Sequence, residues 1–66
     1  MKIHYDPKDD AVYIELAKGK YDVSREISSS VVVDEDKDGK VLGIEILDAS
    51  ENISSFNPKK ISIQTA

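Results

Sequence analysis

The amino-acid sequence predicts a mostly β domain of the α+β class: a small antiparallel sheet, a meander of about five short strands, with one short helix and a C-terminal strand. Eight isoleucines and six valines stand against three leucines, and β-branched residues favour strands over helices. Apolar residues also recur at every second position in short stretches that turn residues separate. A chain of 66 residues is short, so we expect a single domain over residues 1–66.

Residues 31–47 carry the clearest strand signal, a hairpin. A polar run that ends at Gly39 separates three valines from a second apolar stretch, and such runs mark turns. Within the second stretch, Gly43 indicates a bulge or the close approach of another backbone or an aromatic ring. The predicted cross-strand pairs are Glu35 with Lys40, Val33 with Leu42 and Val31 with Ile44. This register places both apolar sets on one face of the hairpin.

The other predicted elements are shorter. The expected strands are residues 2–5, 11–16 and 21–28, with turns at 6–9 and 17–20 and a turn or bulge at 28–30. Asp48 and Glu51 have the spacing of a capping box, which predicts a helix over residues 49–55. Ile53 and Phe56, which lie three positions apart, can dock on the sheet. Residues 59–65 alternate as a last strand, which could pair within the chain or with a partner subunit.

The hairpin tip also matches a calcium motif. Asp34, Asp36, Asp38, Gly39 and Glu45 satisfy the EF-hand pattern D-x-[DN]-x-[DN]-G-x5-E. An EF-hand needs a helix on each side so that its last glutamate returns to the ion. The flanks here are strand-like, so a solvated acidic turn is the preferred interpretation. A weak calcium site that uses Asp34, Asp36 and Asp38 stays open as an alternative.

Composition limits the kinds of site. The chain has no cysteine and one histidine, so we predict no disulfide, no transition-metal site and no cofactor. No stretch is long and apolar enough to span a membrane. The first residues turn polar at once, so we expect a cytoplasmic protein without a signal peptide.

Charge and size indicate the kinds of partner. The net charge is −4, and residues 34–51 hold seven acids against two lysines. Nucleic-acid binding needs Lys and Arg to neutralise phosphates, so no nucleic-acid partner is expected. An acidic surface suits a basic protein partner instead. Because a small domain without covalent staples often gains core by self-association, we also expect a homodimer.

The sequence gives little sign of catalysis. The least favoured alternative is a hydrolase in which folding brings together His4, Asp10 and Asp48. The serines at 28–30 lack a nucleophile-elbow setting, and no residue is assigned a catalytic role. We therefore expect a non-enzymatic interaction module. Its candidate contact residues are Tyr5, Tyr13, Glu45 and Asp48.

Three segments of the chain resemble a known family. They are Tyr5-Asp6-Pro7 with Asp10 to Leu16, then Val33-Asp34 with Asp36 and Asp38-Gly39, and finally Gly43 to Ser50. Over about residues 2–50, the chain resembles the small proteins grouped as domain of unknown function family 2283. The resemblance implies a stand-alone prokaryotic cytoplasmic domain without assigned activity, in some members similar in setting to small partners of toxin-like proteins. Residues 51–66 depart from the longer helix of other members.

Overall fold

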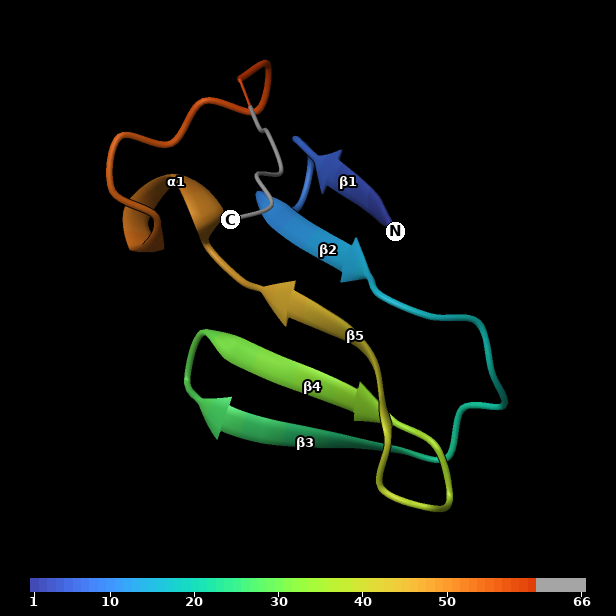
Figure 1. Ribbon diagram of the computed structural model, residues 1–66. Helices are drawn as coiled ribbons and strands as arrows, with labels where there is room; N and C mark the ends of the chain where they lie inside the picture. Colours follow the sequence, from blue (N-terminus) through green and yellow to red (C-terminus); the bar gives the residue numbers. More distant parts are fainter. Residues whose placement is uncertain (61–66) are drawn as a thin grey trace, which may run out of the picture.

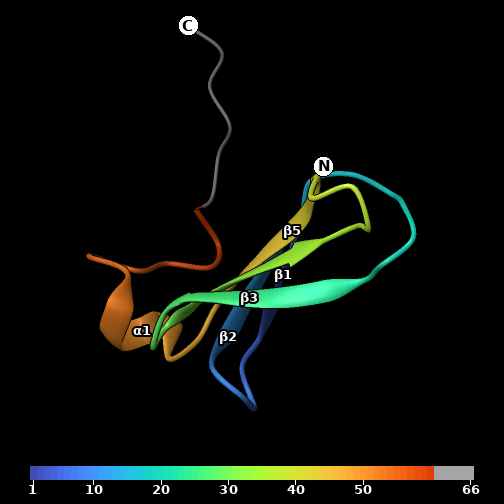
Figure 2. The same cartoon turned by 90° about the horizontal axis from the view of Figure 1, so that it is seen from below.

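The computed structural model of this protein describes residues 1–60 and shows five strands in one open antiparallel sheet (Figure 1). The elements are β1 Lys2–Asp6, β2 Ala11–Glu15, β3 Val23–Ser28, β4 Val31–Glu35, β5 Val41–Ile46 and α1 Ala49–Asn52. The sheet order is β1-β2-β5-β4-β3. Figure 2 shows α1 at one end of the sheet and the connection from β2 to β3 at the other. The predicted fold class is confirmed.

The strand order departs from a simple meander at one connection. β2 pairs with β5 rather than with β3, and the segment between β2 and β3 runs around the ends of β5 and β4, at the right of Figure 1, to the far edge. Backbone bonds hold this segment: Leu16 and Ala17 donate to the carbonyl of Leu42, and Asp22 donates to that of Glu35. The hairpin β4–β5 is therefore flanked on both sides, and β1 and β3 are the edges.

The register of the hairpin differs by two residues from the predicted one. The observed pairs are Val31 with Ile46, Val33 with Ile44, Asp34 with Gly43 and Glu35 with Val41. Leu42, which was predicted opposite Val33, is instead the extra residue of a bulge beside Asp34 and Glu35. Because side chains alternate with period two, a shift of two keeps the valines and isoleucines on a common face.

That common face, which we name the apolar face, runs across the sheet. Residues that pair directly lie on the same side, so the face contains Ile3, Tyr5, Val12, Ile14, Val31, Val33, Ile44 and Ile46. At its β3 edge, Arg25 forms an ion pair with Glu35, which is buried. Val12 is the buried member of the set, and the others are half-buried.

The predicted capping box does not form. Helix α1 is short, Asp48 has a left-handed backbone with φ 49°, and its side chain makes no capping hydrogen bond. The residues after the helix instead cross the apolar face as an irregular segment, residues 53–60. Within it, the ring of Phe56 packs edge-on against Tyr5 at a centroid distance of 5.0 Å. Docking of Phe56 is thus confirmed, whereas the strand predicted at 59–65 lies mostly outside the described residues.

Candidate functional site

The opposite side of the sheet, which we name the acidic face, gathers carboxylates around one tyrosine. Tyr13 pairs with Glu45, and Gly43 lies between Glu15 on β2 and Asp34 on β4. The same side also carries Glu26, which pairs with Val32. Alternation along β2, β5 and β4 therefore brings acids from three strands to one surface.

Gly43 makes room for the Tyr13 ring. A side-chain Cβ atom at Gly43 would lie 2.6 Å from Cζ of Tyr13 and 2.9 Å from the carbonyl oxygen of Ile14. Beside it, Leu42 is buried and, with Tyr13 and Asp34, lines a shallow depression. The predicted approach of an aromatic ring to Gly43 is confirmed, and the bulge lies at the adjacent residue, Leu42.

The environment of Tyr13 stabilises its neutral phenol. Partial burial, followed by the negative charge of Asp34 and a hydrogen bond to it, raises the pKa of the Tyr13 hydroxyl above its usual value. The charges of Glu15 and Glu45 act in the same direction. Tyr13 is thus a neutral, half-buried ring near three carboxylates, and β1 adds Lys2, opposite Glu15, to the same side.

A second polar cluster joins the β1–β2 turn to α1. Asp10 accepts hydrogen bonds from the Tyr5 hydroxyl at 2.8 Å, from the Ser50 hydroxyl at 2.6 Å and from the Ser50 amide at 3.2 Å. Its own carbonyl accepts a bond from the Ala49 amide at 2.8 Å. Asp10 therefore caps α1 from a distant turn, in the place where the local capping box was expected.

The hydrogen bonds of Asp10 set its titration. Those from Ser50, and then that from Tyr5, hold the pKa of the Asp10 carboxyl below its usual range. The same bond to Asp10 raises the pKa of Tyr5. Each donor favours the carboxylate form, and the carboxylate in turn keeps the phenol protonated. The hydrogen bonds of Asp10 thus link the sheet to α1, and they are favoured when its carboxyl group is ionised.

The residues of the hydrolase alternative are not gathered in one place. His4 pairs with Tyr13 and so lies on the acidic face, whereas Asp10 bonds to Tyr5, which belongs to the apolar face. Asp48 is exposed at the start of α1. Of the predicted contact residues, Tyr13 and Glu45 lie together, and Tyr5 and Asp48 lie elsewhere.

Two of the three aspartates of the hairpin tip, Asp34 and Asp36, accept hydrogen bonds from different partners. Asp34 accepts a bond from the Ser24 hydroxyl at 2.7 Å. One oxygen of Asp36 accepts the amides of Asp38 and Lys40, both at 2.9 Å, in a turn that Gly39 completes with φ 80°. Within residues 1–60, no three His, Asp or Glu side chains are placed to hold one metal ion.

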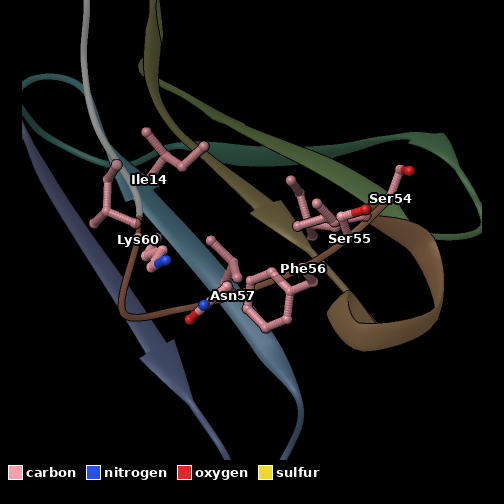
Figure 3. Close-up of a pocket in the computed structure, with 10 residues that line it drawn as sticks. Ile14, Ser54, Ser55, Phe56, Asn57 and Lys60 are labelled. Atoms are coloured by element: carbon pink, nitrogen blue, oxygen red, sulfur yellow. The ribbon is translucent and has the colours of Figure 1, made fainter.

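A groove lies where residues 53–60 cross the apolar face (Figure 3). Its volume is about 320 Å³, and isoleucines and Val12 from the sheet line one wall. Phe56 and Asn57 stand on the other wall, and Lys60 lies at one end. No local sequence pattern indicates this groove, because it forms between segments that are distant along the chain.

Comparison with known proteins places the chain in a family. The family described as "Protein of unknown function (DUF2283)" matches residues 2–50, which include all five strands. The chain belongs to this family. No curated protein and no solved structure matches it. The DUF2283 region contains the acidic face, the hairpin and the Asp10 cluster, and it ends at Ser50, the residue that Asp10 holds.

The helix within residues 1–60 is too short to cross a membrane. The residues that sequence reasoning overlooked are Glu15, which completes the acidic face, and Ser50, which completes the cluster at Asp10. Alternation along residues 11–16 signals Glu15, since it shares a side with Tyr13. Ser50 carries no such local signal, because its partner is distant in sequence.

Proposed function

We propose that this DUF2283 chain is a non-enzymatic protein-interaction module whose acidic face binds a basic segment of another protein. The observation that carries the proposal is the position of Tyr13, a half-buried ring near carboxylates from β2, β4 and β5. Those carboxylates belong to Glu15, Asp34 and Glu45. The strands hold these groups in place before any partner arrives, which lowers the entropic cost of binding.

The chemistry of this surface suits arginine and lysine. A guanidinium group can stack on an aromatic ring while its N–H groups donate to a carboxylate. The net charge of −4 attracts a basic partner at long range and repels an acidic one. Glu45, directly opposite Tyr13, is the acid best placed to pair with a cation over the ring.

Calorimetry with a hexa-arginine peptide tests the proposal, with a hexa-glutamate peptide as the negative probe. We expect saturable binding that weakens as salt rises, because exposed charges are screened. The double variant Glu15→Gln/Glu45→Gln is expected to bind several-fold more weakly.

The matched control is Asp9→Asn/Glu51→Gln, which removes the same charge from exposed sites outside the sheet. This control is expected to keep nearly full affinity. If both double variants lost affinity equally, binding would depend on net charge alone. That result would contradict a site on the acidic face. The cytoplasmic location stays a prediction, and the weak calcium site stays an open alternative.

A further inference from the structure

Residues 54–60, which we name the strap, have few attachments to the sheet. All of them except Phe56 are exposed. Within residues 1–60, the structure shows no hydrogen bond and no ion pair between the strap and the five strands. The hydrogen bonds that the strap makes are internal: the amides of Lys59 and Lys60 both donate to Asn57 at 3.0 Å. Segments with so few bonds to the core can open before the rest of a protein unfolds.

The contact between the strap and the sheet is centred on one ring. Phe56 is half-buried and packs edge-on against Tyr5, with ring centroids 5.0 Å apart (Figure 3). Val12 pairs directly with Tyr5 and is only 3 % exposed. Because Val12 and Phe56 line the same groove, the strap contributes to the burial of Val12.

The start of the helix before the strap is fixed, and a strained residue follows the helix. Ala49 is buried and its amide donates to the carbonyl of Asp10, while the Ser50 hydroxyl donates to the Asp10 carboxylate. These bonds hold α1 on the sheet. Beyond the helix, Ser55 has a left-handed backbone with φ 52°, which is unfavourable for a residue with a side chain. Relief of this strain favours a change of backbone conformation at Ser55.

We propose that the strap is a cover that opens about Ser55 while the sheet and α1 stay folded, and that the contact of Phe56 with Tyr5 holds it closed. In the open state, the strap no longer shields Val12, and the groove wall formed by β1 and β2 faces water. The strap thus controls access to this part of the apolar face. The proposal does not depend on the proposed function, because the acidic face lies on the other side of the sheet.

Thiol labelling measures the opening, because the chain has no cysteine of its own. Val12→Cys places a thiol in the groove, and Leu42→Cys places one at a buried site outside the groove. Dithionitrobenzoate is the probe. At low urea, we expect the labelling rate of Val12→Cys to be independent of urea and at least about 10-fold faster than global unfolding allows, since opening of the strap exposes little surface. Leu42→Cys should be labelled only through global unfolding, at a rate that rises with urea.

Two substitutions of Tyr5, each combined with Val12→Cys, test what holds the strap closed. Tyr5→Phe and Tyr5→Leu both lose the hydroxyl that donates to Asp10, but only Tyr5→Phe keeps a ring for Phe56. At low urea, labelling should be roughly 3- to 10-fold faster in the leucine variant, because an aromatic pair contributes more than its buried area. Equal rates in the two variants would overturn the role of the ring contact.

The urea dependence of Val12→Cys decides the matter by itself if the leucine variant fails to fold. A labelling rate that rises with urea as steeply as that of Leu42→Cys would overturn the proposal. It would show that Val12 becomes accessible only when the whole protein unfolds.

Discussion

The two sides of this sheet use the same strands for different purposes. The apolar face carries isoleucine or valine on every strand from β1 to β5, and at its β3 edge Val23 lies beside the ion pair of Arg25 with Glu35. The acidic face carries four acids, one tyrosine and a glycine, together with Val32 and, on β1, Lys2 and His4. Alternation alone produces this division. The comparison teaches that a chain this short gathers its apolar side chains on one side of its sheet and most of its charged ones on the other.

The largest difference in stability between the two faces is expected when one valine on each face is replaced by alanine. Val12 is 3 % exposed on the apolar face. Val12→Ala should lower the free energy of unfolding by roughly 2–3 kcal/mol, from lost burial and the cavity left behind. Val32→Ala, on the acidic face, should cost about 1 kcal/mol or less. Urea denaturation measures both. Equal losses would show that the two sides contribute alike and would break the comparison.

A smaller loss of stability is expected from a substitution at Gly43, against which the Tyr13 ring packs. Gly43→Ala places a methyl group against Tyr13 and the Ile14 carbonyl, and such overpacking typically costs about 1–3 kcal/mol. Gly19→Ala is the control, because its new methyl group meets only the flexible end of Leu42, at 2.7 Å. Thermal unfolding should rank Gly43→Ala as the less stable variant. The reverse order would mean that Tyr13 does not lie over Gly43.

The cluster at Asp10 should make stability depend on pH. Its pKa is lowered in the folded state, so its contribution is complete above the unfolded pKa of about 4. The contribution is lost as the pH falls through the lower folded-state pKa. Asp10→Asn, which also tolerates the left-handed backbone, should therefore unfold more easily at pH 7 than the wild type. The two proteins should converge in acid.

The exposed neighbour Asp9 gives the control for this pH dependence. Asp9→Asn should follow the wild-type melting temperature from pH 7 down to acid. A constant difference between Asp10→Asn and the wild type at every pH would contradict the account, because it would show that the carboxylate itself is not what ties the sheet to α1.

The smallest effect is expected when calcium is added, at the aspartates of the hairpin tip. Asp36 is engaged with the backbone of its own turn, and Asp34 with Ser24. We therefore expect no saturable heat when calcium is titrated to millimolar concentration. Binding that Asp36→Asn abolishes would contradict this expectation and restore the calcium motif as a site.

Local patterns predicted the strands and missed what joins them. Alternation identified the hairpin, and the unusual glycine at position 43 indicated its close neighbour. Alternation cannot detect a shift of two residues, however, so the bulge at Leu42 escaped it. Pairing of β2 with β5 is non-local, and the sequence does not encode it in any short pattern. The cap on α1 joins Asp10 to Ser50 across 40 positions, so the capping-box rule selected the wrong aspartate.

The central claim is that the bulge sorts side chains between the two faces, with Val33 opposite Ile44 and Leu42 turned to the other side. Nuclear Overhauser measurements on methyl-labelled protein test it most directly. The account predicts contacts between the methyl groups of Val33 and Ile44, and between those of Leu42 and the α-protons of Gly19. Strong contacts between Val33 and Leu42, with none from Leu42 to Gly19, would contradict it.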